Sequence, residues 1–229
     1  GIRDHCVTGV QTCALPIYIF IFIFIMSILG GGQSWGQTTY VWDCSSASTP
    51  TSGSNANVTM GTWAQGNNNG TTTLISTTSG SSGYTGSSGT SNFGAAARTG
   101  ALSTGASGSA YFEITVTPAS GYTVTLTGFS MGSRSTSTGP QAYSFRKSTD
   151  SYGSDVATGS LSNAASWALV SNSGLNAQSA AGTAITFRIY GYNGTGSAAA
   201  GTANWRVDDI SLDRKSTRLN SSHTVISYA

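Results

Sequence analysis

The chain has 229 residues, of which only 8% are charged, and its formal net charge is +2. A typical globular chain has roughly 25% charged residues, so nothing here resembles the basic surface of a nucleic-acid-binding protein. Glycine supplies 30 residues, and the three cysteines are too few for a disulfide framework or a zinc finger. The composition favours one Gly-, Ser- and Thr-rich domain without a nucleic-acid partner.

The two ends of the chain are related through their codons. Residues 1–17 read GIRDHCVTGVQTCALPI, and residues 213–229 read DRKSTRLNSSHTVISYA. A nucleotide string that encodes the second segment also encodes the first when it is read as its reverse complement, and this relation stops at Tyr18 and Leu212. Codon complementarity has no effect on folding. We therefore interpret both segments as translated sequencing-library adapter, with an inverted genomic repeat as the alternative, and exclude them from fold prediction.

We call these two segments the N-terminal and C-terminal arms. Without them, the composition of the remaining residues 18–212 differs from that of the whole chain. They contain no histidine and one cysteine, Cys44. Four of the ten basic and two of the eight acidic residues lie in the arms, which leaves six of each and no net charge. We expect the native protein to be longer than this fragment, and we expect residues 1–17 and 213–229 to lie off the folded domain or to extend it poorly.

Residues 18–29 read YIFIFIFIMSIL, an apolar run of 12 residues. A bilayer span needs about 20 such residues, whereas this length is typical of the hydrophobic region of a signal peptide. Small residues at Ser34 and Gly36 suit a cleavage site. We predict a signal peptide over 18–36 and a secreted or cell-surface protein, with no membrane span in the mature chain; a buried strand is the alternative. In an oxidising compartment, Cys44 is either unpaired or bonded to a group outside the fragment.

Short alternating runs separated by Gly, Ser, Asn and Thr predict one domain over residues 37–212. No run has apolar residues at helical spacing, so the pattern indicates an all-β, antiparallel two-sheet β-sandwich of about ten strands. Residues 79–90, which read SGSSGYTGSSGT, are predicted to form a loop. The predicted strands, in chain order, cover residues 38–43, 58–63, 72–77, 109–117, 122–131, 141–147, 166–170, 183–190 and 203–212.

Three of these strands carry further expectations. Residues 109–117 alternate most clearly, with apolar side chains on one face and Tyr, Glu and Thr on the other. Pro118 ends this strand, and we predict a hairpin that returns along residues 122–131. The apolar phase of residues 203–212 slips near its middle, which predicts a β-bulge at Asp208–Asp209.

The absence of histidine from residues 18–212 excludes a Ser-His-Asp triad, a Cys-His pair and a histidine-based metal site in the native part. A carboxylate-pair glycoside hydrolase is a remote alternative, and it requires two carboxyl groups roughly 5–10 Å apart. Nothing in the context of the acidic residues marks such a pair. We therefore expect a protein that is not an enzyme, with no catalytic residues.

A candidate ligand site lies where the strand over 183–190 ends. Sugars bind by stacking on aromatic rings while polar groups bond their hydroxyls, and Arg188, Tyr190, Tyr192 and Asn193 offer both kinds of group. We predict a glycan-binding site at these four residues. The alternative is a solvated sheet face in which tyrosine is simply a good strand former. In that case the outward arginines, Arg146, Arg188 and Arg206, pair across strands with Glu113 or Asp208.

Two weaker candidates lie elsewhere. Arg134 and Tyr152 form a second pair of a cation and an aromatic residue. Asp208 and Asp209 could bind a structural Ca²⁺ if backbone carbonyls and another acid converge on them. The alternative is that one carboxylate pairs with a neighbouring arginine and the other is solvated. No other cofactor is expected.

The order of features after Ser109 resembles a known family. The segments that carry it are YFEITVTPASGYTVTLTGFSMGSR (111–134), TGPQAYSFRKSTDSYGSD (138–155), TAITFRIYGYNG (183–194) and NWRVDDISL (204–212). They are similar to the galactose-binding-like, carbohydrate-binding-module-like jelly-roll accessory domains of secreted bacterial proteins. The resemblance implies a jelly-roll sandwich that acts as a non-catalytic, monomeric module of a larger protein. No binding residue of that family can be placed here by motif.

Two functions from different classes follow. One is an extracellular module that binds a glycan, and the other is a structural or adhesive spacer without a small-molecule ligand. Two solvent-exposed aromatic residues in a groove near Tyr190 favour the first, and a flat face covered by Ser and Thr favours the second.

Overall fold

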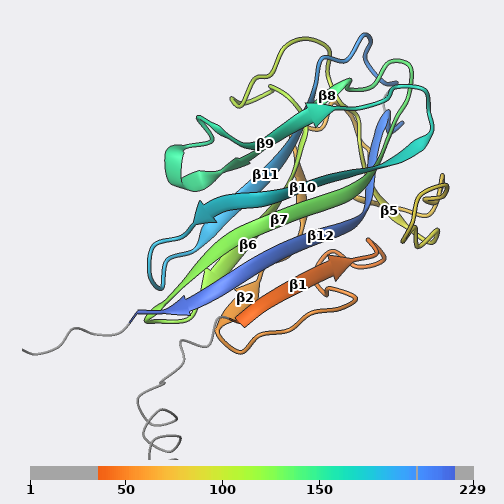
Figure 1. The fold of residues 1–229 in the computed structure, drawn as a ribbon. Helices are drawn as coiled ribbons and strands as arrows, with labels where there is room; N and C mark the ends of the chain where they lie inside the picture. Colours follow the sequence, from red (N-terminus) through yellow and green to blue (C-terminus); the bar gives the residue numbers. More distant parts are fainter. Residues whose placement is uncertain (1–35, 200, 220–229) are drawn as a thin grey trace, which may run out of the picture. The chain divides into compact units, whose positions relative to one another are not determined.

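The structure is a computed structural model that describes residues 36–199 and 201–219. Strands make up nearly all of its regular structure, and the described residues contain one 3-10 helix, η1, over Ser148–Asp150 (Figure 1). The N-terminal arm and residues 18–35 of the predicted signal peptide lie outside the described residues, and Gly36, the last residue of that prediction, begins β1. The strands are β1 (Gly36–Trp42), β2 (Val58–Met60), β3 (Ala64–Gly66), β4 (Ile75–Ser76), β5 (Asn92–Ala95), β6 (Tyr111–Pro118), β7 (Tyr122–Ser135), β8 (Ala142–Lys147), β9 (Asp155–Ser160), β10 (Trp167–Gln178), β11 (Ile185–Tyr192) and β12 (Trp205–Arg218).

The strands form two antiparallel sheets that pack face to face. Sheet A has the order β10-β7-β12-β5-β4, and β1 also pairs with β12. Sheet B has the order β2-β6-β11-β8-β9, and β3 also pairs with β6. The prediction of an all-β two-sheet sandwich is therefore confirmed, with twelve strands in the described residues where about ten were predicted.

Alternation along each strand places one row of side chains between the sheets. In β6, Phe112, Ile114 and Val116 are buried as predicted, and in β11 the same holds for Ile185, Phe187 and Ile189. A side-chain period of two sends the residues between them to the outer face of sheet B. This outer face carries the candidate ligand site.

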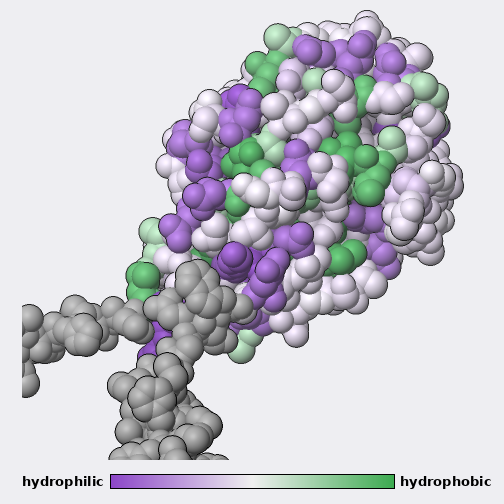
Figure 2. All heavy atoms as spheres, viewed as in Figure 1, coloured by the Kyte–Doolittle hydropathy of each residue, from purple (hydrophilic) through white to green (hydrophobic). Residues whose placement is uncertain are grey.

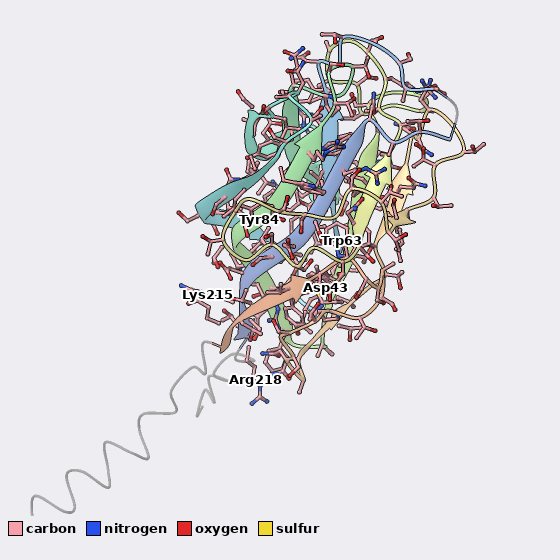
Figure 3. All side chains as sticks on the ribbon, turned by 90° about the vertical axis from the view of Figure 1, so that its right-hand side faces the viewer. Asp43, Trp63, Tyr84, Lys215 and Arg218 are labelled. Atoms are coloured by element: carbon pink, nitrogen blue, oxygen red, sulfur yellow. The ribbon has the colours of Figure 1, made fainter. Side chains whose placement is uncertain are left out.

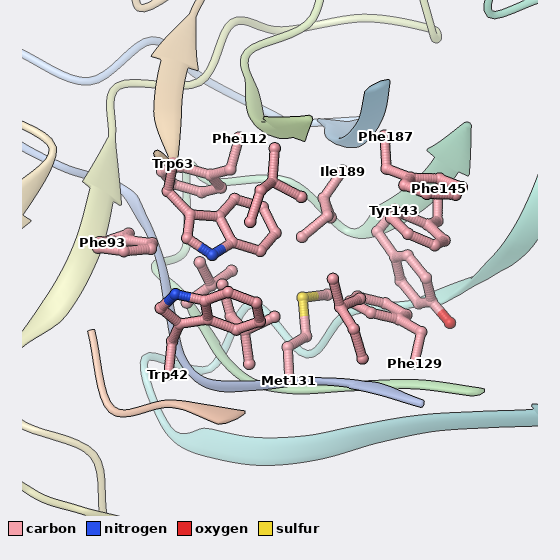
Figure 4. Packing of buried hydrophobic residues seen from close by; sticks show 14 of the residues in the cluster. Trp42, Trp63, Phe93, Phe112, Phe129, Met131, Tyr143, Phe145, Phe187 and Ile189 are labelled. Atoms are coloured by element: carbon pink, nitrogen blue, oxygen red, sulfur yellow. The ribbon is translucent and has the colours of Figure 1, made fainter. Parts of the chain in front are cut away.

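Aromatic residues from both sheets meet in the core (Figure 4). The rings of Trp42 and Trp63 are perpendicular with centroids 5.7 Å apart, and Phe112 lies 4.8 Å from Trp205 across the sandwich. Each buried aromatic side chain removes roughly 150–250 Å² from water, which is the main source of stability in a chain so poor in large apolar residues.

The predicted hairpin between residues 109–117 and 122–131 is wrong. Strand β6 belongs to sheet B and β7 to sheet A, so the short segment after Pro118 crosses from one sheet to the other. The amide of Ala119 donates to the carbonyl of Asn57 rather than to a partner in β7. Apolar alternation identifies the inward face of each strand, but both sheets share that interior, so it does not identify the partner.

The C-terminal end of β12 also differs from expectation. The strand was predicted to end at Leu212, but Asp213–Arg218 continue it and pair with both β7 and β1. Arg214 and Ser216 are buried. The expectation that this part of the arm lies off the sandwich is wrong, because backbone pairing is open to any residue except proline. The hypothesis about the origin of the arm rests on codons and is independent of this pairing.

The predicted bulge at Asp208–Asp209 is confirmed. The register between β12 and β7 shifts between Asp208 and Ser211, and Asp209 has a φ of 47°. Aspartate is among the few non-glycine residues that tolerate this left-handed conformation. The bulge restores the inward phase, so that Ile210 and Leu212 are buried after Trp205 and Val207.

The surface shows small hydrophobic patches separated by polar residues on the face drawn in Figure 2. Leu169 and Ile75 are among the few large apolar residues that are exposed. Within residues 36–199 and 201–219, no helix has the length and hydrophobicity needed to cross a membrane.

Candidate functional site

A row of four charged residues crosses the outer face of sheet B. Glu113 of β6 lies opposite Arg188 of β11, Arg188 lies opposite Arg146 of β8, and Arg146 lies opposite Asp155 of β9. Two like charges on adjacent strands are normally destabilising. Here each guanidinium has a carboxylate on its other side, with Nε to carboxylate oxygen distances of 2.8 Å in both pairs. The row is thus electrically balanced.

Arg188 is clamped between two tyrosine rings. Its guanidinium carbon lies 4.1 Å from the centroid of the Tyr111 ring and 4.1 Å from that of the Tyr152 ring. Its Nε donates to Glu113, and its Nη1 donates to the hydroxyl of Tyr190 at 3.2 Å. The two rings cover both faces of the guanidinium, and cation–π attraction holds it between them. Only the edge of the group is left for further hydrogen bonds.

These contacts also fix the charge of Arg188. Burial alone lowers the pKa of the guanidinium, but the hydrogen bonds to Tyr190 and Glu113 outweigh it and raise the pKa above its ordinary value. Burial likewise raises the pKa values of Tyr111, Tyr152 and Tyr190. The site therefore contains a permanent cation and three neutral phenols at physiological pH.

Arg146 positions the ring of Tyr152. After helix η1, Ser151 and Tyr152 both adopt left-handed backbone conformations, with φ values of 56° and 59°. The Nη1 of Arg146 donates to the carbonyl of Tyr152 at 2.7 Å and to that of Gly153 at 3.3 Å. This arginine therefore holds the tight turn that carries the Tyr152 ring onto Arg188.

Tyr190 lies beneath the site rather than on its surface. Its side chain is fully buried, and its ring packs against those of Tyr111 at 5.2 Å and Tyr152 at 6.3 Å. The prediction that this tyrosine offers an exposed ring is wrong, because the other two tyrosines cover it. Its contribution is the hydroxyl that accepts from Arg188.

The other predicted site residues lie apart from the clamp. Tyr192 is half-buried at the end of β11, opposite Ala142 of β8. Asn193 is exposed in a left-handed conformation, and its amide donates to the carbonyl of Gly100 at 2.8 Å. Among the described residues, neither side chain has a hydrogen bond to Arg188 or to Glu113.

Sequence reasoning missed two members of the clamp and mispaired a third. Tyr111 and Glu113 were placed on an outer face. Pairing of Arg188 with Glu113 was weighed only as the alternative to a ligand site, and Tyr111 was not connected to Arg188. Tyr152 was grouped with Arg134, which lies on β7 of the other sheet and donates from Nε to the carbonyl of Ala165. The alternation of β6 was the available signal for Tyr111 and Glu113.

Asp209 anchors the Gly- and Ser-rich loop, residues 79–90, onto the outer face of sheet A. Its carboxylate accepts hydrogen bonds from the hydroxyls of Ser81 and Tyr84 and from the amide of Ser88. Tyr84 sits in this loop over sheet A (Figure 3). At Gly132 of β7, a Cβ atom would lie 1.9 Å from the Tyr84 hydroxyl, so glycine is what allows the ring to settle there.

Asp208 is buried beneath the same loop. It has no exposed surface, and its Oδ1 accepts from the amide of Asp209 at 2.8 Å. Burial and, to a smaller extent, the charge of Asp209 raise its pKa to about 6. A hydrogen bond with Ser81 acts in the opposite direction and lowers the pKa. Burial and the charge of Asp208 also raise the pKa of the Cys44 thiol, which is free and buried nearby.

The two aspartates therefore secure a loop. The arginine pairing considered as an alternative for them is not observed, since the three ion pairs of the described residues involve other acids. Within the described ranges, no group of three or more His, Cys, Asp or Glu side chains is arranged to hold a metal ion.

Comparison of the chain with protein-family models and with curated protein sequences gives no match. A fixed guanidinium edge, a carboxylate and two half-buried tyrosines form a polar, aromatic surface that can bind hydroxyl groups.

Proposed function

We propose that this protein is a non-catalytic, extracellular or cell-surface β-sandwich module that binds a glycan on the outer face of sheet B. The observation that carries the proposal is the clamp of Arg188 between Tyr111 and Tyr152, with Glu113 at its side. Sugar sites combine aromatic surface with a few fixed polar groups, and this cluster has that composition. The jelly-roll accessory domains that the sequence resembles imply the same function.

The rigidity of the cluster supports binding. A flexible arginine loses side-chain entropy when it binds a ligand, and each immobilised long side chain costs about 0.5–1.5 kcal/mol. In this protein the two rings, Glu113 and Tyr190 already hold the guanidinium of Arg188. A ligand would therefore meet a hydrogen-bonding edge that is ordered in advance.

The acidic residues give little support to the hydrolase alternative. Asp208 has the raised pKa expected of a general acid, but it is fully buried beneath the loop that Asp209 anchors. Glu113 and Asp155 are each engaged with an arginine. A structural or adhesive spacer without a ligand is the stronger alternative. The loop over residues 79–90 is anchored on the outer face of sheet A, which gives that face a structural role.

A glycan array screened with the full chain tests the proposal. Each screen is run with Ca²⁺ and with a chelator, since Asp208 and Asp209 were considered as a calcium site. We expect binding to a defined set of sugars that Tyr152→Ala weakens by about tenfold or more. Tyr122→Ala is the matched control, because it removes a half-buried tyrosine from sheet A.

The alternatives predict different results on the same array. Binding to no glycan, with the chain shown to be folded, would favour the spacer. Binding that Tyr152→Ala and Tyr122→Ala reduce equally would place the site elsewhere. Binding that the chelator abolishes and that Tyr152→Ala leaves unchanged would point to a calcium site and would leave the clamp without its proposed role.

A further inference from the structure

We infer that the site on sheet B selects an uncharged glycan and holds it through neighbouring hydroxyl groups, one accepting from Arg188 and one donating to Glu113. The inference rests on the proposed function and adds the class of ligand. It follows from the charge balance of the site and from the hydrogen-bonding groups that the clamp leaves free.

The charges around the site are already matched. Arg188 pairs with Glu113, Arg146 pairs with Asp155, and Lys147 pairs with Asp150 in the turn beside them. An anionic sugar would have to compete with a carboxylate that is already 2.8 Å from Arg188. It would also lie next to that carboxylate, where like charges repel. The site thus offers an anion no net attraction.

The free groups suit hydroxyls instead. Among the described residues, no hydrogen bond occupies Nη2 of Arg188 or Oε1 of Glu113, although both side chains are partly exposed, at 21% and 30%. One group is a donor and the other an acceptor, side by side on adjacent strands. A hydroxyl both donates and accepts, whereas a carboxylate only accepts. Two neighbouring sugar hydroxyls therefore match this pair, and the carboxylate of a uronic acid or a sulfate group does not.

The experiment compares neutral and acidic oligosaccharides on the full chain by isothermal titration. The neutral probes are cello-, manno- and galacto-oligosaccharides, and the acidic probes are oligogalacturonate and a heparin fragment. We expect neutral binding whose affinity is unchanged by added sodium chloride, because no ion pair forms with the ligand. Glu113→Gln replaces one acceptor with a donor and should weaken neutral binding by about tenfold, the effect of losing one charge-assisted hydrogen bond.

Asp150→Asn is the matched control. It removes a nearby negative charge without touching Arg188, and we expect it to leave neutral binding within about twofold. Thermal unfolding of both variants checks that the sandwich is intact.

The outcomes separate the inference from the function it rests on. Tight binding of the acidic probes by the unmodified chain, with the neutral probes bound weakly or not at all, would overturn the uncharged class and keep a glycan-binding site. Binding by none of the probes or of the arrayed sugars would overturn the proposed function, and the inference with it.

Discussion

Both halves of β12, Trp205–Leu212 and Asp213–Arg218, pair with β7 and β1, and only the first also pairs with β5. They differ in what they place in the core. In the first half, Trp205, Val207, Ile210 and Leu212 face inward and are fully buried. In the second half, over Asp213–Arg218, the buried inward positions hold a charged and a polar residue. Both halves pair with β7, and the register with β1 runs through the boundary without interruption.

Arg214 shows what this difference costs. Its guanidinium donates from Nη2 to the hydroxyl of Tyr40 at 3.0 Å, and it lies 4.8 Å from the centroid of that ring. Its Nε and Nη1 are buried without a partner among the described residues. A buried charge is normally paired with an acid, as Arg188 and Arg146 are in this protein. Position 214 has the environment of an apolar residue and an occupant that does not suit it.

The change in inner-face chemistry falls between Leu212 and Asp213, where the codon relation between the two ends of the chain begins. A β-ladder uses backbone groups that nearly all residues share, so foreign residues can extend a strand without fitting the core. Side-chain burial is the more sensitive measure of whether a segment evolved with its surroundings. The hypothesis that the C-terminal arm does not belong to the native protein rests on the codon relation and stays a prediction.

The largest expected effect comes from the first half of β12. Trp205 packs against Phe112 at 4.8 Å, and its indole nitrogen donates to the Ser133 hydroxyl at 3.2 Å. Trp205→Ala should lower the free energy of unfolding by about 3–5 kcal/mol in chemical denaturation. Ser211→Ala, on the outer face of the same strand, should change it by less than about 0.5 kcal/mol. Similar losses for both would show that the two faces of the first half are not distinct.

The first half also carries two buried ionisable groups, Arg206 and Asp208. Arg206 donates from Nη1 to Asn92 and from Nη2 to Thr78, while its Nε is buried without a partner among the described residues. Asp208 gives the first half a pH dependence. Because the folded pKa of Asp208 is about 6 and its ordinary value is 3.8, the folded state holds this proton more tightly than the unfolded state. Its contribution to stability is complete below about pH 4 and is lost as the pH rises through 6. We expect the free energy of unfolding to fall by roughly 2–3 kcal/mol between pH 4 and pH 7.

The control for this pH effect is Asp208→Asn, which should flatten the profile over the same range. Asp43 and Asp150, whose pKa values are lowered in the fold, act in the opposite direction but mainly below pH 4. A wild-type profile that rises from pH 4 to pH 7 would contradict the assignment to Asp208.

The next prediction tests the second half directly. Replacing Arg214 by Met and Tyr40 by Phe together removes the unpartnered guanidinium and the hydroxyl that it would leave behind. Substituting both partners by apolar groups of similar shape is commonly neutral or stabilising, and we expect a gain of about 2 kcal/mol in the free energy of unfolding. Lys215→Met, one residue along on the outer face, should give no gain. A loss on the scale of Trp205→Ala would mean that position 214 is adapted to arginine.

A sequence pattern shows which face of a strand is buried, but it does not show which strand lies beside it. Alternation over 109–117 and 183–190 identified the inward rows correctly, because a period of two fixes the face of each side chain. It could not reveal that β6 and β7 lie in different sheets. It also underestimated β10, predicted only over 166–170, because residues after Val170 are almost all polar or small and occupy the edge of sheet A.

The candidate site was predictable to a similar degree. Arg188 and Tyr190 were identified from their shared face, and they do lie together. Tyr152 was not connected to them, because its position depends on two left-handed residues after η1 and on a hydrogen bond from Arg146. No local pattern encodes that arrangement. The loop over 79–90 was correctly predicted as irregular, but its anchoring to Asp209 depends on a contact across more than a hundred residues of sequence.

The smallest expected effect concerns that loop and shows how far its influence on β12 extends. Tyr84→Phe removes the hydroxyl that donates to Asp209, which should cost about 1 kcal/mol of global stability. Hydrogen exchange should show a larger local change, with faster exchange at the Ser88 amide, whose acceptor is the same carboxylate. Amides of Asp213–Arg218 should keep their rates, because they lie beyond the bulge and pair with β7 and β1. If they exchange faster by the same factor as Ser88, the loop stabilises both halves of β12, and the two halves are not independent.

The matched control is Tyr122→Phe, which removes the hydroxyl of a half-buried tyrosine on β7. It should leave the exchange rate of the Ser88 amide unchanged.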